Sequence, residues 1–266
     1  MTIVIFASKL ASVINRNPYC KPEETALEMF SRDFYPQYIK TLERLNMIER
    51  VNFIVEPNAK LVEISPKLVE LISSDQPDLP EIDAFARSEG LGDSNLENDI
   101  KKYIQTERGI WHETANMQQL GIEYTQPVVP YKMTLTLSNG DDILLYGRID
   151  GLAIDSEGKE YVIESKNRQY KLFNEVRDYE RIQCVAYIKL TNSTKCLLAE
   201  HFNGSHINHW IHTSDDEWRD IVIQLETFCV YFKSMLMDES MQNDLVSGAA
   251  KIFQRQRLLK RTRRDI

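Results

Sequence analysis

The sequence has few of the features that mark disulfide-rich, cysteine-metal or membrane proteins. Its 266 residues include only four cysteines, which are widely spaced and form no CxxC pair. We expect them to be reduced and buried as small hydrophobic side chains: Cys20, Cys184, Cys196 and Cys229. No apolar run approaches the ~20 residues that span a bilayer, and no basic region precedes the short apolar stretch of the N-terminus. We therefore expect no membrane association and a cytoplasmic protein, or a nuclear one in a eukaryotic or viral setting.

Positive charge is also scarce, since the formal net charge is −8. Nucleic-acid-binding proteins usually have a basic footprint, so this balance argues against such a partner. The charge is uneven, however, because residues 251–266 contain seven Lys or Arg and one acid. With the chain at −8 and this tail at +6, the other 250 residues carry −14. The tail is interpreted as a solvated end, a contact to a nucleic-acid backbone or a nuclear-import signal.

The chain is long enough for one large α/β domain or for a core domain with a helical extension. We divide it into a mostly helical region packing on the core (1–72), a polar loop or linker (73–95), a core (96–250) and the basic tail (251–266). Patterns of alternation, capping and turns predict the following elements: a helix from Pro22, a hairpin at 51–64, a long helix at 96–120, strands at 131–137, 143–150 and 160–166, a helix at 175–190, a hairpin at 196–202 and 206–212, and a helix of ~20 residues after the capping box 214–217. This order predicts an α/β (α+β) fold with a central mixed β-sheet flanked by helices.

Two strands of this expected sheet carry a constellation of charged side chains. Asp150 ends one strand, and Glu164 and Lys166 lie two residues apart on the next, so they point to the same face. Two carboxylates on adjacent strands can bind Mg²⁺, which accepts one or two carboxylates plus water and phosphate oxygens. A lysine beside them can orient water or stabilise charge that develops on a phosphate. The same trio also fits a solvent-facing strand end beside a turn.

The helix expected at 175–190 carries an amide within its apolar stripe. Tyr179, Gln183, Tyr187 and Leu190 follow helical spacing on one face. Burial of an unpaired amide costs about 1–3 kcal/mol. We therefore expect Gln183 to have a partner, which is either a polar group of the core or a carboxylate, lysine or phosphate of an active site.

Three segments in order resemble the PD-(D/E)XK nuclease superfamily: GRIDG (147–151), VIESKNR (162–168) and YERIQCVAYIKL (179–190) are similar to its motifs II and III and its Q-x-x-x-Y helix. Similarity to the RecB-type and YqaJ-like (lambda-type exonuclease) branches extends to RGIWHE and to the NPY segment near the N-terminus, where Asn15-Arg16 replaces a glycine common in that family. The resemblance covers about half of the chain. It implies a restriction-endonuclease-like core, with Asp150, Glu164, Lys166, Gln183 and Tyr187 in the active site.

The resemblance also implies the cofactor, the substrate and the partners. It suggests a deoxyribonuclease dependent on Mg²⁺ or Mn²⁺ that hydrolyses double- or single-stranded DNA ends, as an exonuclease or a processing endonuclease in recombination, repair or replication. A homo-oligomer or a recombination partner protein is possible. The alternative is a catalytically inactive nuclease fold that binds nucleic acid or a protein.

A further metal ligand is implied from the RGIWHE helix. His112 matches the histidine ligand of RecB-type nucleases, whereas Glu113 matches the acid of the YqaJ-like branch. Helical phase places His112 on a polar face with Arg108 and Asn116, and Glu113 on a mostly apolar face with Met117. We favour Glu113 and keep His112 as the alternative. Neither a zinc site at the histidines of 201–212 nor an iron–sulfur cluster at Cys20 is expected.

Overall fold

The computed structural model describes residues 2–47, 66–74, 79–89 and 94–248, and both the hairpin predicted at 51–64 and the basic tail lie outside these ranges. Its elements form a mixed α/β arrangement, which confirms the predicted fold class. In the described part of the chain, no helix is long and apolar enough to cross a membrane.

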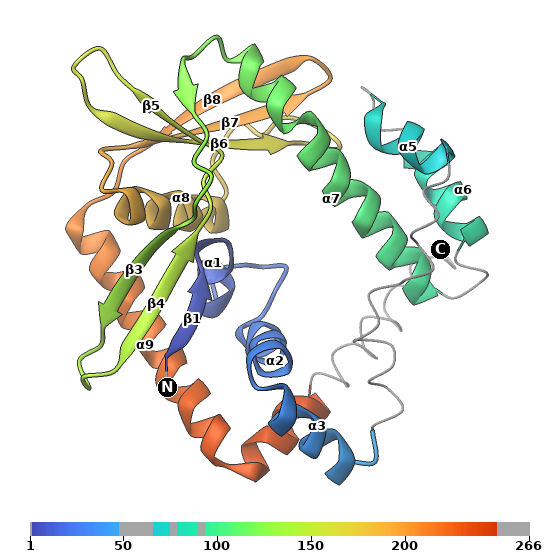
Figure 1. Ribbon diagram of the computed structural model, residues 1–266, viewed down its shortest axis with the longest axis vertical. Helices are drawn as coiled ribbons and strands as arrows, with labels where there is room; N and C mark the ends of the chain where they lie inside the picture. Colours follow the sequence, from blue (N-terminus) through green and yellow to red (C-terminus); the bar gives the residue numbers. More distant parts are fainter. Residues whose placement is uncertain (1, 48–65, 75–78, 90–93, 249–266) are drawn as a thin grey trace.

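The strands form two sheets (Figure 1). The smaller sheet has the order β1-β4-β3, with β1 parallel and β3 antiparallel to β4; its strands are Ile3–Phe6, Asp142–Gly147 and Tyr131–Thr136 for β1, β4 and β3. The larger sheet has the order β2-β5-β6-β7-β8, in which only β6 and β7 are parallel. Its strands are Tyr124–Thr125, Gly151–Ile154, Glu160–Asn167, Cys196–Phe202 and Ser205–Ile211.

The expected strand 143–150 is shorter in the structure. It ends as β4 at Gly147, and the chain then passes through residues 148–150 into β5 of the larger sheet. Asp150 therefore lies on this crossing and does not end a strand. Buried residues alternate with more exposed ones from Ile143 to Ile149, across the point where β4 ends. The sequence pattern is therefore that of one continuous strand, and it does not indicate where β4 stops.

Helix α8 (Asp178–Thr191) lies between the two sheets and contacts β3, β4, β6 and β7. Almost all of its circumference is buried, rather than the single stripe that the sequence predicted. Gly147 permits its close approach to β4, because an added Cβ would lie 2.6 Å from Leu190 Cδ1 and 2.9 Å from Tyr187 Cε1. Helix α9 (Asp215–Met237) covers the same core and begins as predicted, with the Ser214 side chain accepting a hydrogen bond from Glu217 N.

The N-terminal region contributes to this main core. The short η1 (Ala7–Lys9), α1 (Leu10–Val13), α2 (Pro22–Asp33) and α3 (Tyr35–Arg44) follow β1, and their apolar side chains pack with those of α8 and α9. All four cysteines are free thiols. Cys184, Cys196 and Cys229 are buried, as expected, whereas Cys20 is only partly buried.

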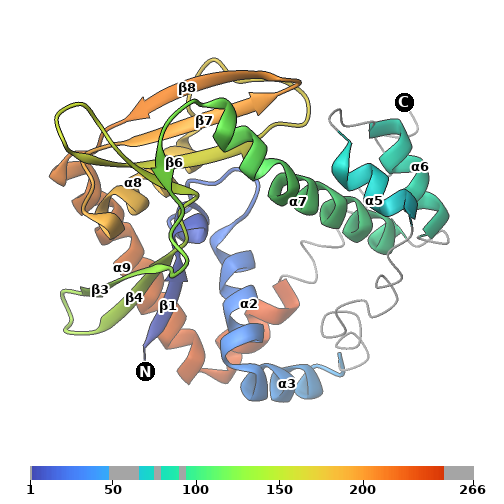
Figure 2. The same cartoon turned by 45° about the horizontal axis from the view of Figure 1, so that its top comes forward.

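Helix α7 (Ser94–Gln119) runs from α5 and α6 to the larger sheet (Figures 1 and 2). Its C-terminal end packs Met117 on the other face of the larger sheet, against Ile163 and Leu197. Its N-terminal half packs with α5 (Pro66–Ser73) and α6 (Leu79–Glu89) in a separate small cluster. Residues 79–89 are thus helical, where the sequence predicted a loop, because Ile82 and Ala86 bury an apolar face on α7.

Candidate metal-dependent active site

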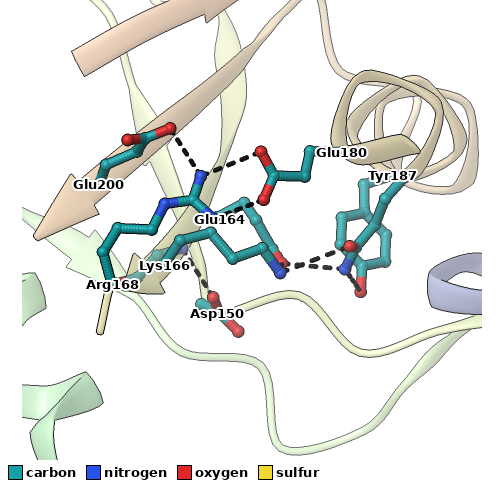
Figure 3. A network of polar contacts seen from close by, with 9 residues as sticks. Asp150, Glu164, Lys166, Arg168, Glu180, Tyr187 and Glu200 are labelled. Atoms are coloured by element: carbon teal, nitrogen blue, oxygen red, sulfur yellow. Dashed lines mark hydrogen bonds and ion pairs between the residues drawn. The ribbon is translucent and has the colours of Figure 1, made fainter. Parts of the chain in front are cut away.

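Four of the predicted site residues come together where α8 faces the end of β6 (Figure 3). Lys166 Nζ donates to Glu164 Oε1 at 2.5 Å, and Gln183 Nε2 donates to the same oxygen at 2.9 Å. Gln183 Nε2 also lies 3.0 Å from Tyr187 Oη, and Lys166 Nζ lies 3.4 Å from Gln183 Oε1. The partner expected for Gln183 is therefore the carboxylate and lysine of the site.

Asp150 reaches this group from the crossing between the sheets. Its Oδ2 accepts a hydrogen bond from Ser165 N at 2.8 Å, which fixes the carboxylate beside β6. The glycine that follows leaves room for its neighbours, because an added Cβ at Gly151 would lie 2.7 Å from Met117 Cε of α7 and 3.1 Å from Tyr124 Cδ2. The glycines on either side of Arg148–Asp150 therefore let α8 and α7 approach the crossing closely.

The carboxylates of the site repel one another. Burial raises the pKa of Glu164 above its ordinary value, and the charge of Asp150 raises it further. Burial likewise raises the pKa of Asp150, despite the opposing hydrogen bond from Ser165. For Lys166, burial alone would lower the pKa, but Glu164 and Asp150 raise it above its ordinary value, so the ammonium stays charged. A single lysine therefore faces two carboxylates, and the site favours a further positive charge.

One buried oxygen of the site is left over. Glu164 is 3% exposed, and its Oε2 has no hydrogen-bond partner among the described residues. An unpaired carboxylate oxygen in the interior costs free energy unless a cation or a donor contacts it. Together with Asp150, it provides the two carboxylates and the oxygen donors that Mg²⁺ and Mn²⁺ prefer.

Glu113 and His112 of α7 differ in where they point. Burial raises the pKa of Glu113, and the charge of Glu164 raises it further. The charges of Arg148 and Lys166 oppose this rise. Glu113 Oε1 accepts a hydrogen bond from Gln126 Nε2 at 3.0 Å. The ring of His112 instead places Nε2 3.1 Å from the Ser74 carbonyl, beyond the end of α5. Glu113 thus shares the electrostatic environment of the site, and His112 contacts the residue that follows α5.

The carboxylates of Asp150, Glu164 and Glu113 do not form a preformed metal site. Within residues 2–47, 66–74, 79–89 and 94–248, no three His, Cys, Asp or Glu side chains are grouped so that they could hold a metal ion. A site of two carboxylates, Asp150 and Glu164, is the arrangement that the contacts support, and the remaining ligands of Mg²⁺ are commonly water and phosphate oxygens.

The faces of α7 differ from those predicted. Two large apolar side chains, Ile110 and Trp111, are exposed, at 59% and 58%. Arg108 and Asn116, predicted on a polar face, are buried. The reason is that α7 is covered by different partners along its length, and Arg108 donates to the Leu71 carbonyl of α5 at 2.6 Å.

A buried charge network next to the site was missed by the sequence reasoning. Arg168 directly follows β6, two residues after Lys166, and donates two hydrogen bonds to Glu180 of α8, at 2.6 and 2.9 Å. It donates a third to Glu200 of β7 at 2.6 Å (Figure 3). Glu200 also accepts a hydrogen bond from Phe173 N at 2.7 Å. The spacing of Lys166 and Arg168 on one strand face is the only signal that could have indicated it.

Two other residues near the site were also missed. Gln126 contacts Glu113, as described above, and exposed Arg148 acts electrostatically on the same carboxylate. Arg148 belongs to the GRID segment, so its charge could have been noticed beside Asp150. Nothing in the sequence near Gln126 indicates its contact.

Three solved structures are similar to parts of this chain. The crystal structure of SSO0001 is 16% identical over 62% of this chain and 74% of its own, with a TM-score of 0.39. LHK-Exo, an alkaline exonuclease from Laribacter hongkongensis, is 16% identical over 56% of this chain and 75% of its own, with a TM-score of 0.38. LHK-Exo in complex with dAMP is 14% identical over 64% of this chain and 93% of its own, with a TM-score of 0.37. Such low values say nothing about activity. No protein-family model and no curated protein matches the sequence.

Proposed function

We propose that the protein is a DNA nuclease of the PD-(D/E)XK type that depends on Mg²⁺ or Mn²⁺ and hydrolyses phosphodiester bonds at DNA ends, as an exonuclease or a processing endonuclease. The observation that carries the proposal is the meeting of Glu164, Lys166 and Gln183 beside Asp150, with one buried Glu164 oxygen unpaired. The partly buried carboxylate of Asp150 is held beside this group by Ser165 N and adds a second negative charge next to Glu164. The likeness to LHK-Exo agrees with the proposal but does not support it independently.

In this proposal Asp150 and Glu164 would hold the divalent ion together with water and phosphate oxygens, and Glu113 of α7, which is not grouped with them, would add negative charge nearby. When bound, the ion supplies Lewis acidity, which makes water a better nucleophile and offsets charge on the phosphate. Lys166 is held charged between Glu164 and Gln183, so it can orient the attacking water or stabilise the negative charge that develops on the phosphoryl oxygens. Gln183 keeps Glu164 and Lys166 in register, and Tyr187 supports the amide of Gln183.

The reaction follows from these positions. A water oxygen forms a bond to phosphorus, the bond from phosphorus to one ester oxygen breaks, and a proton reaches the oxygen that leaves. Exposed Arg148, near Glu113, is suitably placed to contact the phosphate of the incoming strand. The acidic charge of the rest of the chain then requires the basic side chains near the site, or the tail, to supply the attraction for DNA.

One observation favours a second function. Lys166 and Gln183 already satisfy Glu164 Oε1, and the described residues show no grouped set of three metal ligands. This is the arrangement expected of an inactive nuclease fold in which the lysine replaces the ion and the protein only binds nucleic acid or a partner. The two functions differ in whether a divalent ion binds and whether DNA is cut.

Incubation of the purified protein with labelled linear, circular, single-stranded and double-stranded DNA, with Mg²⁺, Mn²⁺ or EDTA, separates them. We expect cleavage only with a divalent ion. Binding of DNA without cleavage under every condition would support the inactive fold, and calorimetric titration with Mn²⁺ shows separately whether the site binds a metal.

A further inference from the structure

An exposed tyrosine is held next to the candidate active site. Tyr19 is 77% exposed, although its ring contacts the ring of Tyr179 edge-to-face, with centroids 5.7 Å apart. Tyr179 lies one helical turn before Gln183 on the same side of α8. Tyr19 therefore presents aromatic surface to solvent beside the helix whose next turn contacts Glu164 and Lys166.

The loop that carries Tyr19 is fixed at several points. Asn17 Oδ1 accepts a hydrogen bond from Tyr19 N at 3.0 Å, and Asn17 Nδ2 donates to Ser12 Oγ of α1 at 3.0 Å. Arg16 forms a two-point ion pair with Asp178, the first residue of α8, with Nε 2.8 Å from Oδ2. The ring is thus exposed without being loosely attached, which is the property of an aromatic side chain that binds a ligand at low entropic cost.

Positive charge lies beside the tyrosine pair. Burial and then the charge of Glu180 raise the pKa of Tyr179, and the nearby charges of Arg168 and Arg177 oppose this rise. Arg177 precedes Asp178 and places its guanidinium carbon 4.3 Å from the centroid of the Phe173 ring. Arg168 is engaged by Glu180 and Glu200, so Arg177 is the candidate for a phosphate contact.

We propose that Tyr19 stacks on an unpaired nucleobase of the strand whose phosphate enters the carboxylate site, so that the protein selects single-stranded or frayed ends. The inference rests on the proposed function, since it assigns the substrate of that site. An exposed aromatic ring next to a cation and a phosphate-binding site has the composition of a single-strand platform, and stacking tolerates any base. A paired base inside a duplex has both faces stacked already, so only an unpaired base can use the ring.

Binding is measured in EDTA, which separates it from cleavage. The probe is a single-stranded oligonucleotide with a terminal 2-aminopurine, followed by fluorescence anisotropy and by quenching of the 2-aminopurine. We expect Tyr19→Ala to weaken binding about tenfold and to abolish the quenching. Tyr19→Phe should retain both, because the ring and not the hydroxyl stacks. Tyr35→Ala is the matched control, since Tyr35 is also exposed but lies on α3, away from α8 in both views (Figures 1 and 2).

The outcomes distinguish this proposal from the proposed function. If wild type cleaves DNA with Mn²⁺ but Tyr19→Ala binds and quenches like wild type, the stacking is wrong and the nuclease stands. If wild type never cleaves but Tyr19→Ala loses binding and quenching, the stacking stands and the nuclease fails. Equal weakening of blunt duplex and single strand, or no binding of single strands by wild type, would also overturn the proposal, the latter pointing to a protein partner for Tyr19.

Discussion

Gln183 contacts three polar side chains of the candidate site at once. Its position therefore determines how Glu164 and Lys166 are held. Its Nε2 donates to Glu164 and lies 3.0 Å from Tyr187 Oη, and its Oε1 lies 3.4 Å from Lys166 Nζ. Gln183→Ala should lower the rate of cleavage by at least ~10-fold, because Glu164 loses a donor and Lys166 loses a neighbour. Steady-state kinetics measure the loss.

Gln224→Ala is the matched control for this substitution. The Gln224 amide donates to the Asp220 carbonyl of its own helix, so the variant should keep the activity of wild type. Wild-type kinetics in Gln183→Ala would exclude a role of this amide in the site.

His201 gives a prediction about acid stability. It is 2% exposed, and neither ring nitrogen has a hydrogen-bond partner among the described residues. Burial, with a smaller contribution from His206, lowers its pKa to about 4. In the unfolded chain His201 therefore takes up a proton near its ordinary pKa of about 6.5, whereas in the folded protein its ring stays neutral at that pH. This contribution to stability is complete above pH 6.5 and is lost as the pH falls toward 4.

The Tm should therefore fall between pH 6.5 and 4.5, and His201→Gln should show a smaller fall over this window. Exposed His212 serves as the control, since His212→Gln should keep the slope of the wild type. The same slope for all three proteins would show that His201 titrates alike in the folded and unfolded states.

The partner of Gln183 could be predicted from the sequence, and the network of Arg168 could not. An amide in an apolar stripe requires a partner on physical grounds alone. Glu180 and Glu200, in contrast, are distant along the chain and look like ordinary solvated acids of a helix and a strand. Only the pairing of β6 with β7 and the packing of α8 bring them to Arg168.

Among the secondary-structure elements, α8 and β7 are linked by ion pairs to Arg168, which directly follows β6, in addition to their apolar packing. The side chains of Arg168, Glu180 and Glu200 are 11%, 3% and 0% exposed. Arg168→Met leaves two buried carboxylates without their cation, so the free energy of unfolding should fall by about 3–5 kcal/mol. Urea unfolding measures this change.

Arg219→Met tests the specificity of that effect. Arg219 pairs with Asp216 on the surface, where both side chains are well exposed, so its removal should change stability by less than about 1 kcal/mol. Similar losses in the two variants would show that the Arg168 network is no more important than a surface ion pair.

The elements themselves were predictable to different degrees. Strands β6, β7 and β8 and helices α8 and α9 agree with the patterns of alternation and capping, because each is bounded by turn residues. The break between β4 and β5 was missed because Asp150 continues the expected strand in sequence. On α7, Met117 is buried as predicted, whereas Arg108 and Asn116, predicted on a polar face, are buried as well. The reason is that this helix packs on the larger sheet at one end and on α5 and α6 at the other.

For the whole molecule, the acidic charge is the main difficulty for a DNA-binding function. The seven Lys and Arg of residues 251–266 offset it, although this tail lies outside the described residues. Deletion of the tail should weaken DNA binding and reduce its salt dependence, because each phosphate contact releases counterions. Cleavage at saturating DNA should persist, since the site residues lie elsewhere. Plots of log Kd against log salt concentration decide this, and equal slopes with and without the tail would show that it does not touch DNA.

The most direct test of the account is metal-dependent cleavage by Glu164→Gln. This substitution keeps the size of the side chain and removes the charge that is proposed to hold the metal ion. With linear DNA and Mn²⁺, we predict that wild type and Glu160→Gln cleave alike, because Glu160 is an exposed acid of the same strand. Glu164→Gln should show no cleavage while its circular dichroism spectrum is unchanged. Near-normal turnover by Glu164→Gln, with the same requirement for Mn²⁺, would contradict the assignment of this site.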